Sequence, residues 1–179
     1  MRIQLKNVRL SYANVWEPRA MNEGQPPKYS AALLMDPNTK EGKKNLEALD
    51  DAITKVYEEA IPTKFEGKRP TNWRYPVYEG DEEKGEAYEG MMYVNAKSNT
   101  RPGIVDRRAD PILDQSEVYS GCYANVSVTL YAYNNAGNKG VGVGLGNIQK
   151  LKDGESLGGN IKAENEFSVI EDDDEDFLD

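Results

Sequence analysis

The segment "CYANVSVTLYAYNNAGNKGVGVGLGNIQKL", residues 122–151, decides the fold. Between residues 123 and 133 the even positions carry small apolar side chains, and the odd positions carry hydroxyls, an amide and three tyrosine rings. Successive side chains of a strand point to opposite faces, so this alternation predicts a strand with one face in a core and the other polar but aromatic. The Asn- and Gly-rich stretch 134–139 predicts a turn into a second, glycine-rich strand, and hence a β-hairpin.

The remainder of the chain predicts further strands, one helix and long loops. Strands are indicated by alternation or by short apolar runs, the helix by apolar residues at steps of three and four, and loops by prolines and glycines. The expected elements are strands at 2–12 (with a bulge near Asn7), 28–35 and 91–96, a helix at about 40–60, and loops at 14–27, 63–90 and 97–111.

About five β segments with one helix favour a mainly β fold, and among these a small, partly open five-stranded barrel of the oligonucleotide-binding (OB) type. The helix of a standard OB barrel lies between the third and fourth strands, whereas this helix follows the second. We expect a single domain over residues 1–170, with a loosely ordered extension at 151–170, and a disordered acidic tail at 171–179.

Composition excludes several classes of site. The 179 residues include no histidine and a single cysteine, so His-based catalysis and an internal disulfide are excluded. Acidic runs at 79–83 and 172–176 offer carboxylates to a divalent ion, as in a nuclease, but they lie in flexible stretches with no supporting geometry. We expect no catalytic residue, no metal and no cofactor. No apolar run reaches the roughly 18 residues of a membrane span, and residues 1–10 do not have a signal-peptide pattern, so we expect a cytosolic protein.

The net charge of −9 is concentrated at one end of the sequence. Residues 171–179 hold seven acids and no base, which leaves 24 acids against 22 bases in residues 1–170, a net charge of −2. The body of the chain is therefore nearly neutral, and nucleic-acid binding is compatible with it. An acidic DNA mimic that inhibits a host nuclease is an alternative, but it would need charge spread over a folded face.

Tyrosines and basic residues share several predicted faces and loops. The odd face of residues 123–133 is aromatic, Tyr93 and Lys97 have the same parity, and basic residues alternate with aromatic ones at 64–78. Bases stack on tyrosine rings whatever their identity, for about 1–3 kcal/mol each, and Arg and Lys neutralise phosphates. Tyrosines also suit any sheet surface, and Arg107 has nearby acids with which to pair. The glycines of 140–146 lack the strand-turn-helix context of a dinucleotide fingerprint, and they would let a base or another backbone lie close.

Together these segments resemble a family of phage single-stranded-DNA-binding proteins. The resemblance is carried by "NVRLSYANVWEP", "KYSAALL", "NTRPGIVD", "VYSGCYANVSVTLYAYN", "GNKGVGVGLGNIQKLKDGESLGG" and the acidic end. It implies an OB-type fold, binding of single-stranded DNA with little sequence preference, and no catalytic residues. Parity and chemistry select the residues that we expect to touch DNA. They are Tyr12, Trp16, Trp73, Arg74, Tyr93, Lys97, Arg101, Arg107, Tyr119, Tyr123, Tyr131 and Lys139.

The acidic end predicts a second role. Its acids would compete with DNA for a basic groove, and its apolar tip would be captured by a replication or recombination protein. The residues concerned are Asp172, Asp173, Asp174, Asp176, Phe177 and Leu178. A plain solubilising tail is the alternative. We expect the protein to act in the cytoplasm of the infected bacterial host, away from membranes. The sequence leaves open RNA binding and a homo-oligomer.

Overall fold

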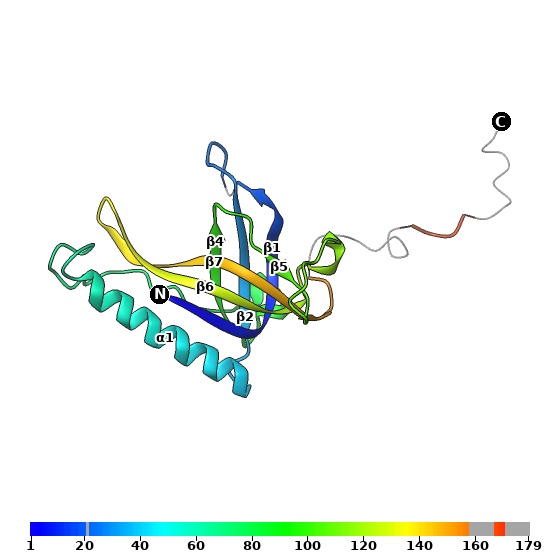
Figure 1. Cartoon of the computed structure of the whole chain (residues 1–179), viewed down its shortest axis with the longest axis horizontal. Helices are drawn as coiled ribbons and strands as arrows, with labels where there is room; N and C mark the ends of the chain where they lie inside the picture. Colours follow the sequence, from blue (N-terminus) through cyan, green and yellow to red (C-terminus); the bar gives the residue numbers. More distant parts are fainter. Residues whose placement is uncertain (21, 158–166, 171–179) are drawn as a thin grey trace.

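The computed structural model describes residues 1–20, 22–157 and 167–170 (Figure 1). The expected acidic tail at 171–179 lies outside the described residues. The elements, in chain order, are β1 (Arg2–Arg19), β2 (Lys28–Met35), α1 (Lys40–Ala60), β3 (Tyr78–Glu79), the 3-10 turns η1 (Glu82–Lys84) and η2 (Glu86–Tyr88), β4 (Met92–Ser98), β5 (Ile104–Val105), η3 (Gln115–Glu117), β6 (Tyr123–Asn135) and β7 (Asn138–Lys152).

Five of the strands close a barrel. Strands β4, β2, β1, β6 and β7 pair antiparallel in that order, and β4 also pairs with β7 in parallel, where Lys97 is the partner of Gly144. The short strands β3 and β5 extend the sheet at its two ends. The predicted five-stranded barrel is thus confirmed, and the parallel pairing closes it where the sequence predicted a partly open one.

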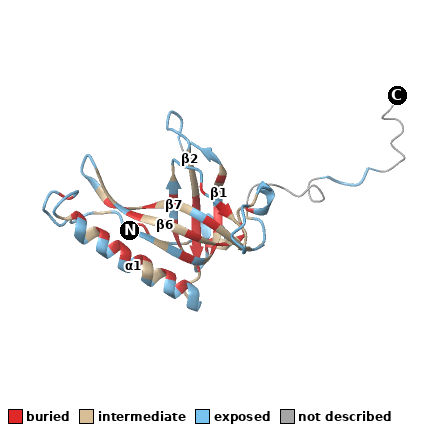
Figure 2. Ribbon diagram, viewed as in Figure 1, coloured by how far each residue is buried: buried red, intermediate tan, exposed pale blue. Residues whose placement is uncertain are grey.

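The β6–β7 hairpin matches the pattern from which it was predicted. The even positions from Ala124 to Leu130 are buried, as are Val141, Val143 and Leu145 of β7. These side chains form one core with residues of β1, β2 and α1. Because polar and aromatic residues alternate with the buried ones, they lie on the outside of the hairpin. Figure 2 shows buried residues alternating with half-buried ones along β6 and β7.

Helix α1 has the predicted bounds and follows the second barrel strand. Its first turn is capped by Thr39, whose hydroxyl accepts a hydrogen bond from the Gly42 backbone N–H at 3.0 Å. The buried Asn45 side chain accepts a hydrogen bond from Lys6 N–H and donates one to its carbonyl, which fixes the helix against β1. Figure 1 shows α1 running alongside β1, β6 and β7. No helix in the described part of the chain is long and apolar enough to cross a membrane.

Strand β1 is longer than predicted, because irregularities in its pairing let it bend. Its register shifts near Asn7, again after Ser11 and once more between Asn14 and Arg19, and both Asn7 and Tyr12 have positive φ angles, of 52° and 46°. The bulge near Asn7 was predicted. The second bulge was not, and beyond it β1 continues with β2 through residues 14–19, part of the segment predicted as a loop. In Figure 1 this part of β1 rises with β2 away from the barrel.

Candidate nucleic-acid interface

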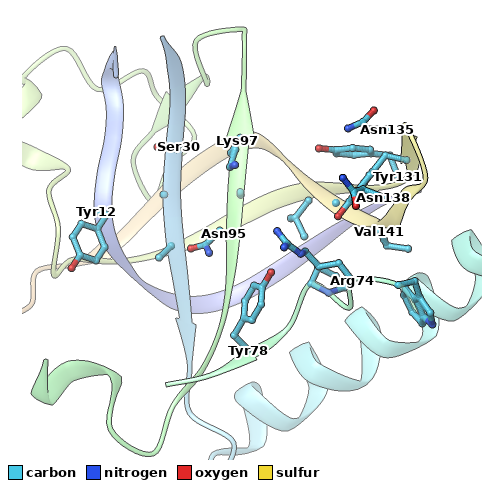
Figure 3. Close-up of a pocket in the computed structure, with 18 of the residues that line it drawn as sticks. Tyr12, Ser30, Arg74, Tyr78, Asn95, Lys97, Tyr131, Asn135, Asn138 and Val141 are labelled. Atoms are coloured by element: carbon cyan, nitrogen blue, oxygen red, sulfur yellow. The ribbon is translucent and has the colours of Figure 1, made fainter. Parts of the chain in front are cut away.

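A groove of about 1310 Å³ crosses the face of the sheet (Figure 3). At one end Tyr12 of β1 borders it, and its floor passes over β2 and β4, where Ser30, Asn95 and Lys97 lie. At the other end it reaches the tip of the β6–β7 hairpin. The segment before β3 borders the groove between β4 and the hairpin, and Lys84 of η1 also lines it, so six separate parts of the chain contribute to one surface.

The groove is basic. Its lining includes Arg19, Arg74, Lys84, Lys97 and Lys139, and none of the described residues that line it is acidic. Amide side chains from several strands and turns provide further polar contacts, namely Asn14, Asn72, Asn95, Asn135 and Asn138. A cleft lined by charges of one sign concentrates the field and attracts a ligand of the opposite sign. The local charge is therefore opposite to the net charge of the chain.

Two tyrosines at the hairpin end lie over glycines. Tyr131 is paired with Gly142 across the hairpin, and Tyr133 with Gly140. A methyl group added at Gly142 would lie 2.5 Å from Cζ of Tyr131, and one added at Gly140 would lie 2.6 Å from the hydroxyl of Tyr133. Two of the four glycine positions that were predicted to let a base or a backbone lie close, Gly140 and Gly142, are thus occupied by tyrosine side chains. Tyr131 remains 47% exposed and lines the groove.

Tyr12 marks the opposite end of the groove. It lies at the second bulge of β1, has a left-handed backbone conformation that is unusual for a residue other than glycine, and is 63% exposed. The bulge turns the side chain out of the sheet. An exposed aromatic ring therefore stands at each end of the groove, with Lys97 on the strand between them (Figure 3).

Arg74 is fixed to the hairpin through its backbone. Its N–H donates to the Lys139 carbonyl at 3.0 Å, and its carbonyl accepts from the Val141 N–H at 3.1 Å. The neighbouring Trp73 is half-buried, with its ring centroid 4.6 Å from that of Tyr57 on α1. Trp73 was predicted to touch DNA, and it does line the groove, but its packing also holds the segment that presents Arg74.

Tyr75 fixes the same segment from the other side of Arg74. Its hydroxyl donates to the Asp50 carboxylate of α1 at 2.7 Å. Burial, together with this hydrogen bond, raises the pKa of Tyr75, so the hydroxyl keeps its proton and remains a donor.

Tyr93 has the predicted parity but not the expected exposure. Tyr93, Asn95 and Lys97 alternate along one face of β4, yet Tyr93 is only 5% exposed. The centroid of the Tyr78 ring lies 5.5 Å from that of Tyr93. The centroid of the Tyr88 ring lies 5.2 Å from it, and the planes of these two rings are at 88°. Tyr78, which is paired with Tyr93 across β3 and β4, lines the groove in its place.

Three of the predicted residues, Trp16, Arg101 and Arg107, lie outside the groove lining. The Trp16 indole packs against the core and donates to the Val118 carbonyl at 3.0 Å, and the Arg101 guanidinium lies 5.6 Å from its ring. Arg107 donates to the Leu151 carbonyl at 3.0 Å. The pairing of Arg107 with acids that the sequence left open does not occur among the ion pairs of the described residues.

Tyr119 and Tyr123 also lie away from the groove lining. The Tyr119 hydroxyl donates to the Gly154 carbonyl at 2.9 Å and accepts from the Gly154 N–H at 3.2 Å. The ring of Tyr123 has the charged ends of Arg9 and Lys152 at 5.6 and 4.8 Å from its centroid. Tyr123 begins β6 while Tyr131 is near its end, so one face of a single strand serves two different surfaces.

Sequence reasoning missed part of the groove. Arg19 lies in the half of β1 that was predicted as a loop, and Lys84 follows the acidic run 79–83 in the predicted loop 63–90. Tyr133 had the right parity, and Tyr78 belonged to the basic and aromatic segment 64–78, so both carried a usable signal. The predicted tail residues Asp172, Asp173, Asp174, Asp176, Phe177 and Leu178 lie outside the described residues. Over 1–20, 22–157 and 167–170, no three His, Cys, Asp or Glu side chains are grouped to hold a metal ion.

Solved structures with the same fold come from two phages. The single-stranded DNA-binding protein of bacteriophage Enc34, solved in complex with single-stranded DNA, has a TM-score of 0.67 and 26% identity over 88% of this chain and 89% of that chain. The single-stranded DNA-binding protein of bacteriophage T7 has a TM-score of 0.63, covers 89% of this chain and 98% of that chain, and at 14% identity shows the fold alone. These matches confirm the predicted OB-type fold.

Sequence comparison extends the likeness to nearly the whole chain. "Putative protein p50" of Acyrthosiphon pisum secondary endosymbiont phage 1 is 31% identical in an alignment that covers 95% of this chain and 94% of that protein. The model of a family described as the single-stranded DNA-binding protein of Enterobacter phage Enc34 matches residues 1–178. The chain belongs to the Enc34 single-stranded DNA-binding protein family.

Proposed function

We propose that this chain binds single-stranded DNA in the groove, largely without regard to sequence and without a catalytic step, during phage DNA replication and recombination. The observation that carries the proposal is the combination of exposed aromatic rings and five basic side chains in one groove, with no acid among its described lining residues. Membership of the family, and the solved complex of the Enc34 relative with single-stranded DNA, support the same conclusion.

Phosphates supply most of the affinity in this proposal. Lys97 lies at the centre of the groove, and Arg74 and Lys139 lie at the hairpin end. An Arg fork binds phosphate oxygens bidentately, whereas a Lys acts as a mobile point charge. Each phosphate that is neutralised releases counterions, which makes the affinity fall with salt by a slope of about −0.7 per contact on a log–log scale for a single strand.

Stacking supplies affinity that does not depend on the base. Tyr12 and Tyr131 present exposed rings at the two ends of the groove, and any base has a face to stack on them. A duplex keeps its bases paired and stacked, so it can offer phosphates but not base faces. RNA offers both, and stacking surfaces do not sense the 2′-hydroxyl.

The acidic tail has a regulatory role in this proposal. Seven acids within residues 171–179 would compete with DNA phosphates for the groove, and Phe177 and Leu178 would be captured by a replication or recombination protein once DNA displaces the tail. The protein would act in the cytoplasm of the infected host, where the single-stranded intermediates of replication and recombination form.

Titration of single-stranded DNA, RNA and duplex DNA of equal length tests the function. We expect affinity to decrease in that order. Lys97→Gln should weaken single-strand binding, and the matched control Lys55→Gln, on the exposed side of α1, should not. Duplex binding that equals or exceeds single-strand binding would contradict the proposal, and so would equal effects of the two lysine variants.

A further inference from the structure

A second, smaller cavity adjoins the groove beyond Tyr12. It has a volume of about 570 Å³ and lies between β1, η2 and residues 155–157. Tyr12 and Lys84 line both the groove and this cavity, so the two spaces meet at these side chains. The volume lies within the range of about 300–1,000 Å³ that is usual for small-molecule sites.

The chemistry of this cavity differs from that of the groove. Two bases, Arg9 and Lys84, are balanced by two acids, Glu86 and Glu155. Arg9 is also held by backbone carbonyls, since its Nε donates to Gly121 at 3.2 Å and its Nη2 donates to Glu155 at 2.8 Å. A balanced site does not attract a phosphate strongly. The remaining lining suits a neutral ligand.

That remaining lining is partly apolar and partly hydroxylic. Ala87, Tyr88 and Leu157 provide apolar surface, and Ser120 and Ser156 provide hydroxyl groups. Flat heterocycles with hydrogen-bonding edges match such a lining, because their faces are apolar and their edges are polar. A nucleobase is a ligand of this kind.

Tyr12 stands where the groove and the second cavity meet. Its centroid lies 6.4 Å from that of Tyr88, with the rings tilted by 47°. Its positive φ is a strained conformation for a tyrosine, which a structure retains when the surroundings require it. The fold therefore holds an exposed ring, at a cost in backbone strain, at the point where the groove and the second cavity meet.

We propose that the second cavity receives one unpaired base at the end of a DNA strand that lies in the groove, with Tyr12 between this base and the preceding one. This inference rests on the proposed function and extends it. It assigns the base, rather than the phosphate, as the recognised group at this end. A duplex cannot deliver such a base without unpairing, so the cavity also contributes to selectivity for single strands.

The test uses two separate changes: a substitution in the protein that fills the cavity, and an oligonucleotide that lacks one base. Ser156→Trp places a bulky ring on an exposed lining residue, and Glu47→Trp, on the exposed side of α1, is the matched control. Each protein is titrated with oligothymidylates that carry one abasic residue at successive positions. In the unaltered protein, an abasic residue at one end of the bound stretch should weaken binding at least about fivefold, the loss of one stacked base.

Ser156→Trp should bind the intact oligonucleotide at least about fivefold more weakly than the unaltered protein does. An abasic residue at the sensitive position should then weaken the binding of this variant no further. Glu47→Trp should behave as the unaltered protein does. Ser156→Leu, which fills less of the cavity, should show a smaller effect in the same direction, and thermal melting checks that both variants fold. Unaltered affinity and an unaltered abasic profile in the Ser156 variants would overturn the inference. Failure of the unaltered protein to bind any single strand would instead refute the proposed function.

Discussion

Replacing Gly142 by alanine should weaken single-stranded DNA binding without unfolding the barrel. Gly142 lies in β7 with no positive φ, so alanine fits its backbone. The added methyl group would lie 2.5 Å from Cζ and 2.6 Å from the hydroxyl of Tyr131. Carbon atoms in comfortable contact are about 3.5–4.0 Å apart, so the ring must move by about 1 Å or more.

The structure sets the size of the effect. Tyr131 is half exposed, so its ring can turn outward at a cost of about 0.5–1.5 kcal/mol for leaving its preferred rotamer. Alanine gains about 0.5–1 kcal/mol over glycine within a strand, which offsets most of that cost. The free energy of unfolding should therefore change by less than about 1 kcal/mol. Affinity should fall by about five- to a hundredfold, because a displaced ring loses the 1–3 kcal/mol of one stacked base.

Gly144 provides a matched control on the same face of the same strand. A methyl group there would lie 3.5 Å from the Thr129 carbonyl oxygen and 3.7 Å from its Cβ, which is ordinary contact. Gly144→Ala should therefore bind as the unaltered protein does. Fluorescence titration of an oligothymidylate, with thermal melting alongside, measures both quantities for each variant.

A double-mutant cycle identifies the cause. If Gly142 acts only by positioning Tyr131, adding Gly142→Ala to Tyr131→Ala should cost nothing more. Additive losses would refute this reasoning, because they would mean that Gly142 contacts DNA directly. Unchanged affinity of Gly142→Ala would show that the ring does not stack on a base in its present position.

Three further predictions follow from the groove and the tail. Tyr131→Ala should weaken binding several-fold with little change in melting temperature. Tyr93→Ala should lower the free energy of unfolding by about 3 kcal/mol, because it removes one ring from a buried aromatic cluster. If Tyr93→Ala instead weakened binding and left the melting temperature unchanged, Tyr93 would face DNA. Arg74→Gln should reduce the log–log salt slope of binding by about 0.7, and Arg107→Gln should leave it unchanged; equal slopes in a salt titration would remove Arg74 from the phosphate path. Deleting residues 171–179 changes the net charge from −9 to −2 and should strengthen binding at low salt with a smaller gain at high salt; unchanged low-salt affinity would separate the tail from the groove.

Regular spacing is what made the elements predictable. Apolar residues that recur every three or four positions predicted α1 at its observed bounds. Alternation of apolar and polar residues predicted the β6–β7 hairpin. Both patterns reflect a fixed geometry of the backbone. The second half of β1 escaped prediction because the bulge at Tyr12 breaks the alternation, and because Pro18 is typical of a loop.

The lining of the groove was predicted in part, for a related reason. Parity placed Tyr131 and Lys97 on outward faces, and both line the groove. The same parity placed Tyr93 and Tyr123 outward as well. Tyr78 and Tyr88 cover Tyr93, and Tyr123 lies at the end of β6 that is far from the groove. Parity tells which side of a strand a residue occupies. It does not tell what else packs on that side.

The sequence by itself determined the helix, the five barrel strands apart from the second half of β1, the two faces of those strands, and the separation of a nearly neutral body from an acidic end. These properties depend on residues that are close along the chain. Only the tertiary structure decided which basic and aromatic residues share one groove. Arg19, Lys97 and Lys139 come from segments far apart in the sequence, and the pairing of β1 with β2, of β2 with β4 and of β4 with β7 brings them together. Their joint field depends on distances through space, which no local pattern in the sequence encodes.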